Sequence, residues 1–369
     1  MNENKAKLLI KRLIGDEKRQ AYTIPLLAIL CSLAVVSLLL LALGNNPIVA
    51  FRSILAGAGV LPRPNYASGR GMLTDIMLTL SELTPMILAS LAVIVALKGG
   101  LFNIGVSGQM LFAGYFATVI VGYSALPAFI AKPLVILVGA VCGAAIGMFI
   151  GWMKYRFNIN EVVSSIMLNY IIQFVTTFFI ITRYVDPITR HSREVSSASR
   201  LVLQNVMIGE YRTVLPVFIF LAIVMVFALR FFIDRTRAGF DLRAVGLNSR
   251  AARYIGISPS LNTLLAMTIS GGLAGLAGVT HYLGLHGSIP LRELSTTGFE
   301  AIAVALLGNT SPVGALFASA LITVISRGST YMSSVLNVQR EISQVITGLI
   351  LLFSACGAFL KQILNKEGS

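Results

Sequence analysis

Long apolar runs recur along most of this chain and restrict its fold more than any other feature of the sequence. The first of them, residues 22–43, contains no charged side chain. A helix needs roughly 20 predominantly apolar residues to cross the hydrocarbon core of a bilayer, and this run is long enough to do so. Only 12% of the 369 residues are charged, whereas charged residues make up roughly a quarter of a typical soluble domain. The sequence therefore predicts an all-α integral membrane protein.

The apolar runs predict about ten transmembrane helices, some of them discontinuous. An even number of spans places both termini on one side of the membrane, and the basic residues 1–21 place that side in the cytoplasm. We therefore expect a cytoplasmic segment at 1–21, a transmembrane domain at 22–360 and a cytoplasmic tail at 361–369. The expected spans are 22–43, 76–97, 110–123, 133–153, 162–182, 214–232, 261–285, 298–307, 315–325 and 342–360.

The second span, 76–97, contains Pro85, and the segment that follows the span is rich in glycine. Proline removes a backbone hydrogen-bond donor from a helix, so we expect this span to be discontinuous. Residues 98–109 contain four glycines among small and polar residues, which predicts a further interruption. Irregular backbone at membrane depth is tolerated only where protein or a water-filled cavity satisfies it. The interrupted region therefore either lines a substrate path or forms a tight turn at the membrane surface.

Two short apolar segments in different halves of the chain are similar to each other. Residues 92–99 (AVIVALKG) are similar to residues 301–308 (AIAVALLG), and each is followed by a glycine-containing break. Many transporters are built from internal repeats with broken helices near the substrate path. A repeat would explain the likeness, but so would the shared apolar composition of two helices.

Polar and aromatic side chains inside or beside the expected spans are candidates to line a substrate path. An acidic group inside a membrane is costly and is mostly paired or functional, and Glu82 is the acid that we expect to lie deepest. Asn169 lies about two turns into its span, where its amide either binds a polar ligand or hydrogen-bonds another helix. For Glu161, Glu300 and Glu341, which lie near span ends, we expect structural hydrogen bonds. The candidate path residues are Glu82, Asn103, Gln109, Asn169, Tyr170 and Phe299.

Residues 231–260 form a basic stretch between two apolar segments, and the number of preceding spans places this stretch in the cytoplasm. The stretch contains the signals of a short helix, because Asn248 or Ser249 can cap the start and Gly256 can end it. Pro259 lies just beyond. A short capped helix between two membrane spans needs a surface to press against. We therefore expect it to contact another protein in the cytoplasm.

Several function classes lack the residues that they require. No G-x-x-x-x-G-K-[ST] motif occurs in the sequence, which excludes ATP hydrolysis by a P-loop. The three histidines show no metal-ligand spacing, and the three cysteines lie in apolar runs, where a disulfide framework is not expected. The net charge of +14 resides in the connecting segments, which is typical of a membrane protein oriented by its basic residues. We expect no enzyme activity, cofactor, metal or nucleic-acid partner.

Four segments, in order, resemble the permease subunits of bacterial ABC importers, in the superfamily that includes ribose and branched-chain amino acid permeases. They are KGGLFNIGVSGQ (98–109), NEVVSSIMLNYI (160–171), RAGFDLRAVGLNSRAARYIGIS (237–258) and GFEAIAVALLGNTSPVG (298–314). The second and fourth segments are most similar to the nucleoside-uptake branch. The resemblance covers about residues 75–360. It implies that residues 22–360 are a permease domain in the bacterial plasma membrane, which forms the translocation path of a nucleoside importer.

The resemblance also implies partners. A second, related permease, identical or distinct, pairs with this one. Two cytoplasmic ATPase subunits use ATP, and an extracytoplasmic lipoprotein delivers the substrate. Residues 231–260 are then a coupling loop, in which residues 239–257 match the segment that docks on the ATPase. The implied coupling residues are Arg243, Gly246, Asn248, Arg250, Arg253 and Gly256.

Two alternatives stay open at this point. The same architecture could import a ribose-like sugar or a branched-chain amino acid in place of a nucleoside. An ion-coupled secondary transporter, which works without an ATPase, also has apolar spans and broken helices.

Overall fold

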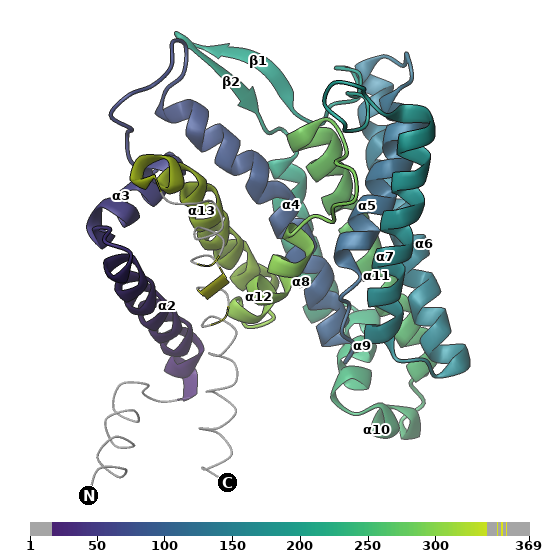
Figure 1. The fold of residues 1–369 in the computed structure, drawn as a ribbon. Coiled ribbons are helices and arrows are strands. Elements are labelled where there is room, and N and C mark those ends of the chain that lie inside the picture. The colour runs from purple at the N-terminus through teal and green to yellow at the C-terminus, as the bar shows by residue number, and fades with distance from the viewer. Residues whose placement is uncertain (1–16, 338–344, 346–347, 350–351, 353–369) are drawn as a thin grey trace, which may run out of the picture.

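The computed structural model describes residues 17–337, 345, 348–349 and 352, and the described part of the chain is mostly helical (Figure 1). Short π-helical segments (η1–η3) extend three of the helices at their C-terminal ends. The elements are α2 (Glu17–Ala42), α3 (Pro47–Gly57), α4 (Met72–Lys98), α5 (Val106–Ala117), η1 (Thr118–Gly122), α6 (Ala128–Phe157), α7 (Glu161–Phe179), η2 (Ile180–Tyr184), β1 (Leu203–Ile208), β2 (Tyr211–Leu215), α8 (Ile219–Arg235), α9 (Arg237–Leu247), α10 (Ser249–Tyr254), α11 (Pro259–Val279), η3 (Thr280–His286), α12 (Thr297–Leu307) and α13 (Pro312–Leu336).

Five of these helices are long and apolar enough to cross a membrane, and a sixth span results if α2 and α3 are counted as one bent pair. The expected number of spans is therefore not confirmed. One reason is length: α12 has 11 residues, and a helix of that length spans only about 16 Å. The last expected span, 342–360, lies almost wholly outside the described residues.

An antiparallel pair of strands, β1 and β2, makes the prediction of an all-α protein wrong in one segment. The turn between the strands is at Gly209, whose φ of +62° favours glycine. Arg212 of β2 donates its backbone N–H to the carbonyl of Gly69 at 2.8 Å. The hairpin therefore covers the start of α4, at the end of the molecule opposite to α10 (Figure 1).

α4 is one continuous helix of 27 residues, so the expected break at Pro85 does not occur. A proline removes only one backbone donor, and a membrane helix tolerates this where neighbouring helices and hydroxyl side chains compensate. α4 packs against α8, α11, α12 and α13 and is largely buried. The hydroxyl of Thr84 donates to the carbonyl of Leu80 at 3.0 Å. Packing on several sides thus holds the helix together across the proline.

The helix does end where the glycine-rich segment predicts it. Gly99 caps α4 with φ −81° and ψ 4°, and α5 begins only at Val106. In the other similar segment, Gly308 caps α12 with φ −71° and ψ 7°, before α13 begins at Pro312. The two similar segments therefore share a helix, a glycine cap in one conformation and a break.

α6 and α11 approach each other through glycines. A Cβ on Gly143 would lie 2.2 Å from the carbonyl oxygen of Gly271, and a Cβ on Gly275 would lie 2.0 Å from that of Gly139. Small residues let helix backbones come this close inside a membrane. The glycines of α6 and α11 therefore form the faces through which these two helices pack.

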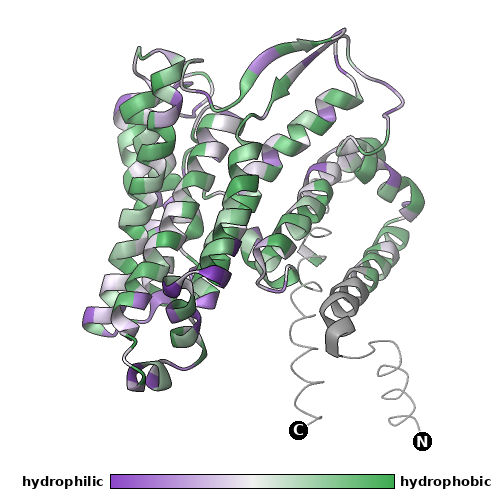
Figure 2. Ribbon diagram, turned by 180° about the vertical axis from the view of Figure 1, so that it is seen from behind, coloured by the Kyte–Doolittle hydropathy of each residue, from purple (hydrophilic) through white to green (hydrophobic). Residues whose placement is uncertain are grey.

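α3 lies against α13 and joins α2 at an angle of 117°. Ala50, Ser53 and Ile54 of α3 are buried. Gly57 of α3 packs against Gly328 of α13, where a Cβ would approach the Gly328 Cα to 3.0 Å. Hydrophilic residues gather at the α9–α10 end and along the hairpin, whereas the helices between them are mostly hydrophobic (Figure 2).

Candidate functional site

The basic stretch after α8 folds into two short helices, α9 and α10, at one end of the molecule (Figure 1). The Thr236 hydroxyl caps α9 by accepting from Gly239 N at 3.1 Å. Asn248 Oδ1 caps α10 by accepting from the backbone N–H groups of Arg250 and Ala251, both at 3.1 Å. Gly256 follows α10 with a φ of +84°, a conformation that glycine adopts without strain. The short capped helix predicted from the sequence is confirmed.

α10 presents apolar and basic side chains to its surroundings. Leu247, Tyr254 and Ile255 are 88%, 93% and 68% exposed, and Arg250 and Arg253 are exposed beside them. Exposed aromatic and aliphatic side chains mixed with arginines are typical of the surfaces that bind other proteins. We call these five residues the α10 surface.

Two further residues of the implied coupling set, Arg243 and Gly246, lie on α9. Arg243 Nη1 lies 4.0 Å from Asp234 Oδ1, and both groups are partly exposed. Gly246 lies against the break between α4 and α5, since a Cβ on it would come within 2.2 Å of the carbonyl oxygen of Lys98. The other side of this contact is Gly100, whose φ is +72°. Two glycines therefore bring α9 against the break.

Asn103 of the break and Gln109 of α5 are buried and hydrogen-bond to each other. Asn103 Nδ2 donates to Gln109 Oε1 at 3.0 Å and to Ser270 Oγ at 2.8 Å. Asn103 Oδ1 accepts from Gly105 N at 2.9 Å. Ser270 Oγ passes the network on to the carbonyl of Ala92 in α4 at 2.7 Å. These two candidate path residues thus belong to a hydrogen-bond network that joins the break to α11 at Ser270 and to α4 at the Ala92 carbonyl.

Asn169 fixes the break to α7. Its Oδ1 accepts from Gly108 N at 2.9 Å, and its Nδ2 donates to the Ile104 carbonyl at 3.1 Å. Gly108 N belongs to the first turn of α5, where backbone donors have no partner within the helix. The Asn169 amide therefore ties α7 to the first turn of α5 and to the break before it.

A polar cavity of about 160 Å³ lies elsewhere, between α4, η3, α12 and α13. It contains two carboxyl groups, two imidazoles and four hydroxyl groups. We call it the polar cavity; its lining residues are Glu82, Pro85, Met86, His281, Leu285, His286, Thr296, Thr297, Glu300, Thr323 and Ser326.

The polar groups of this cavity are only partly satisfied by the protein. Glu82 Oε1 accepts from Arg327 Nη1 at 2.5 Å. Thr323 Oγ1 and His281 Nδ1 are buried without a hydrogen-bond partner, although buried polar groups are nearly always paired. The His281 and His286 rings contact each other, with centroids 4.6 Å apart. The cavity therefore offers hydrogen-bonding capacity to a polar solute.

No three His, Cys, Asp or Glu side chains among the described residues are grouped in a way that could hold a metal ion. The two carboxylates and two imidazoles of the polar cavity are included in that statement.

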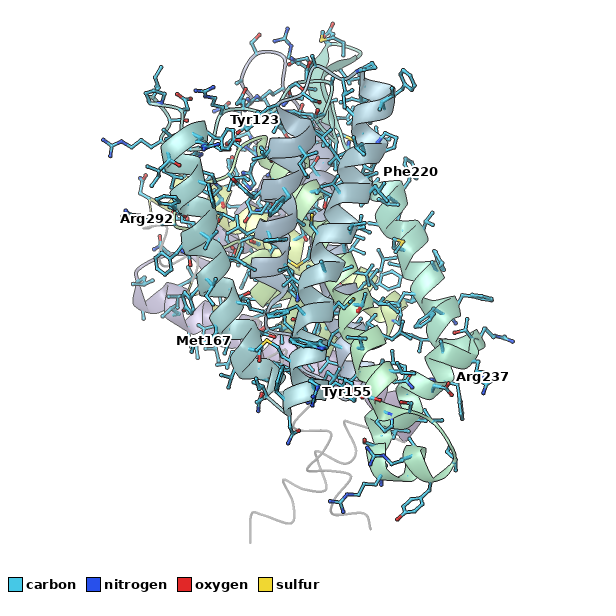
Figure 3. All side chains as sticks on the ribbon, turned by 90° about the vertical axis from the view of Figure 1, so that its right-hand side faces the viewer. Tyr123, Tyr155, Met167, Phe220, Arg237 and Arg292 are labelled. Atoms are coloured by element: carbon cyan, nitrogen blue, oxygen red, sulfur yellow. The ribbon has the colours of Figure 1, made fainter. Side chains whose placement is uncertain are left out.

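The polar cavity lies at a helix start between the two ends of the molecule. The loop between η3 and α12 is held there by Arg292, whose carbonyl accepts from Gln173 Nε2 at 2.5 Å and whose N–H donates to Thr177 Oγ1 at 3.2 Å. Arg292 lies between the end marked by Tyr123 and the end marked by Tyr155 (Figure 3). α12 therefore begins inside the helical body, with Glu300 in its first turn.

Of the candidate path residues, Glu82 is the one that lines the polar cavity. Tyr170 and Phe299 are 54% and 44% exposed on α7 and α12. Glu300, for which we expected a structural hydrogen bond, lines the cavity. Sequence reasoning also missed His281, although a histidine within an apolar run is a recognisable signal of a polar site. Glu341 lies outside the described residues.

Glu161 has the structural role that the sequence predicts. Its Oε2 accepts from Lys154 Nζ at 2.5 Å, which links the start of α7 to the end of α6. Asn160 caps α7 by accepting from Val162 N at 2.8 Å.

Most of the chain is similar to known proteins. Residues 76–355 match the family described as branched-chain amino acid transport system / permease component. The nucleoside ABC transporter permease protein NupB of Lactococcus lactis subsp. cremoris (strain MG1363) is 32% identical over 359 residues, which are 95% of this chain and 95% of NupB. The guanosine ABC transporter permease protein NupP of Bacillus subtilis (strain 168) is 34% identical over 345 residues, 93% of this chain and 95% of NupP.

An archaeal relative has a different substrate in its name. The glucose ABC transporter permease protein TsgB13 of Haloferax volcanii is 29% identical over 351 residues, 93% of this chain and 89% of TsgB13. The family match and the apolar helices together make the chain a multi-pass membrane protein. It belongs to the family of permease components of branched-chain amino acid transport systems.

Proposed function

We propose that the chain is the membrane-spanning permease subunit of an ABC importer that takes up nucleosides. The observation that carries this proposal is the similarity to NupB over nearly the full length of both proteins. NupP, named for guanosine, is similar over a comparable share of the chain. The subunit provides a path for the solute and leaves ATP hydrolysis to its partners.

The α10 surface supports a docking role toward an ATPase. It combines exposed Tyr254 and Ile255 with two arginines, and it lies at the end of the molecule opposite to the hairpin (Figure 1). In the proposed orientation, this end and both termini are cytoplasmic, and the hairpin end faces the lipoprotein. A complete importer then contains a second permease, two ATPase subunits and the lipoprotein, in a bacterial plasma membrane.

The glycine contact between α9 and the break supports a route for coupling. Movement of α9 on ATP binding acts on Lys98 and Gly100 directly, because Gly246 leaves no space between them. The break is in turn bonded to α7 and α11 through Asn169 and Ser270. The proposed mechanism is alternating access, in which ATP binding and hydrolysis in the partner subunits move these helices together.

Sugar import is the second candidate function. TsgB13, a permease named for glucose, is similar to 93% of this chain. A branched-chain amino acid is the substrate in the family's description. An ion-coupled transporter, by contrast, predicts uptake without any ATPase.

Uptake assays in matched strains distinguish these functions. Cells that lack the chain and cells that carry it are compared for uptake of labelled guanosine, uridine, glucose, ribose and leucine. We expect nucleoside uptake to depend on the chain and to be lost when the P-loop lysine of the partner ATPase is replaced. Chain-dependent uptake of glucose or leucine instead of nucleosides would overturn the proposed substrate. Nucleoside uptake that survives the ATPase variant would overturn the proposed energy source.

A further inference from the structure

The polar cavity has a charge pattern that restricts the solutes it can bind. Its lining includes Glu82 and Glu300 but no lysine or arginine. The nearby cation, Arg327, is already paired with Glu82. An anionic solute would therefore meet carboxylates in a confined space, where like charges repel strongly. This pattern favours a neutral solute that donates hydrogen bonds.

Glu300 is the carboxylate available to such a solute. Among the described residues it has no cationic partner within salt-bridge distance, whereas Glu82 has Arg327. A carboxylate has about four acceptor sites, so Glu300 retains capacity for further donors. Its place in the first turn of α12 also suits its negative charge.

Two further groups face the same space without partners. Thr323 Oγ1 is buried, with 2% of the residue exposed, and lacks a hydrogen-bond partner. His281 Nδ1 is also buried and unpartnered. A hydroxyl can donate and accept, and a neutral imidazole nitrogen does one or the other. Together with the carboxylate of Glu300, these groups complement the hydroxyls of a sugar ring.

The size of the cavity agrees with a part of a nucleoside rather than the whole. Its volume of about 160 Å³ is below the roughly 300–1,000 Å³ of sites that enclose a drug-sized ligand. The ring of a pentose is the smaller, hydroxyl-rich part of a nucleoside. The base would extend beyond the cavity lining.

We propose that the polar cavity binds the sugar ring of the transported nucleoside, with the vicinal 2′- and 3′-hydroxyls donating to Glu300 and bonding to Thr323 and His281. This inference rests on the proposed nucleoside function and adds a solute-binding site to it. It assigns to the permease itself a preference for ribonucleosides over deoxynucleosides. A site built to bond a hydroxyl discriminates against analogues that lack it, because its own polar groups are then left unpaired.

The experiment compares uptake of guanosine, 2′-deoxyguanosine and 3′-deoxyguanosine by the complete importer with one unchanged lipoprotein. The variants are Glu300→Gln and the nearly isosteric Thr323→Val. Glu293→Gln is the matched control, because Glu293 is exposed and does not line the polar cavity. Immunoblots of the membranes establish that each variant is present at the wild-type level.

We expect both cavity variants to lower the ratio of kcat/KM for guanosine to that for each deoxynucleoside by about tenfold, and Glu293→Gln to leave it unchanged. An unchanged ratio in Glu300→Gln and Thr323→Val, with either normal or uniformly reduced uptake, overturns the inference. If one variant is absent from the membrane, the other decides the outcome. A wild-type importer that takes up none of the three compounds contradicts the proposed function itself, which is a different result.

Discussion

Gly246 of α9 touches the last turn of α4 at Lys98, so closely that a Cβ on the glycine would lie 2.2 Å from the lysine carbonyl oxygen. No residue other than glycine fits this position without moving the backbone. The contact joins the cytoplasmic helix pair of the proposed importer to the membrane helix that lines the polar cavity.

Replacing Gly246 by alanine should therefore disturb this junction. Overpacking against a fixed backbone costs about 1–3 kcal/mol, and we expect uptake to fall by at least about tenfold while the protein remains in the membrane. Gly272→Ala is the control, since a Cβ there would have its nearest neighbour at 3.6 Å. Normal uptake by the Gly246→Ala variant would contradict the role of this contact in coupling.

Charge reversal at Arg250 tests the α10 surface. Arginine is enriched among the residues that contribute most to protein interfaces. We expect Arg250→Glu to weaken binding of the ATPase subunits by about five- to thirtyfold, which corresponds to roughly 1–2 kcal/mol. Co-purification of the complex at graded ATPase concentrations measures this. Arg156→Glu, at an exposed position near the end of α6, serves as the control, and an equal loss with both variants would argue against specific docking through α10.

Asn169 should contribute to stability through its two hydrogen bonds. Asn169→Leu keeps the size of the side chain but leaves the N–H of Gly108 and the carbonyl of Ile104 without their partner. Each buried unpaired group costs about 1–3 kcal/mol, so thermal unfolding in detergent should occur at a clearly lower temperature. Replacement of the exposed neighbour Tyr170 by leucine should change the unfolding temperature little. If Asn169→Leu unfolds normally but changes the KM for the solute, the amide belongs to the substrate path instead.

The glycine packing of α6 and α11 gives a prediction with two adjacent positions. A Cβ on Gly271 would lie 2.3 Å from the carbonyl oxygen of Gly143, whereas Gly272 has space for one. We expect Gly271→Ala to destabilise the protein by about 1–3 kcal/mol and Gly272→Ala to have little effect. Denaturant or thermal unfolding of the two variants decides this. Equal stabilities would mean that the helices separate at little cost.

The ion pair of Glu82 and Arg327 at the polar cavity can be tested by a double-mutant cycle. Arg327→Ala leaves the carboxylate of Glu82 without its partner in a partly buried position. We expect a loss of about 1–3 kcal/mol, less than for a fully buried pair because both side chains retain some contact with solvent. The double variant Glu82→Ala, Arg327→Ala should recover part of that loss. Additive effects of the two single changes would show that the pair contributes nothing.

Local signals in the sequence predicted local structure well. Asn248 and Gly256 mark the start and the end of α10 because caps depend on the backbone of a few neighbouring residues. The glycines of residues 98–109 predicted the break, because Gly99 ends α4 and Gly100 adopts a φ of +72°.

Pro85 and the hairpin show where such reasoning fails. The effect of a proline depends on the helices around it, and these cannot be read from the proline's own segment. The strands Leu203–Ile208 and Tyr211–Leu215 lie at a connection between expected spans, where no strand was predicted. Gly209 between two β-prone segments was a usable signal for a turn. The polar cavity could not be predicted from the sequence, because Glu82 and Glu300 line the same space only through the packing of α4 against α12.

The continuity of α4 has a mechanical consequence. Residues 82 and 98 belong to the same unbroken helix, and the helix between them is about 24 Å long. With a hinge at Pro85, each half of α4 could tilt alone, and displacement at one half would be absorbed before it reached the other. Without that hinge, the helix acts as a lever: a tilt of a few degrees imposed at Lys98 moves Glu82 by one or two ångströms, about the difference between a hydrogen bond made and a hydrogen bond broken.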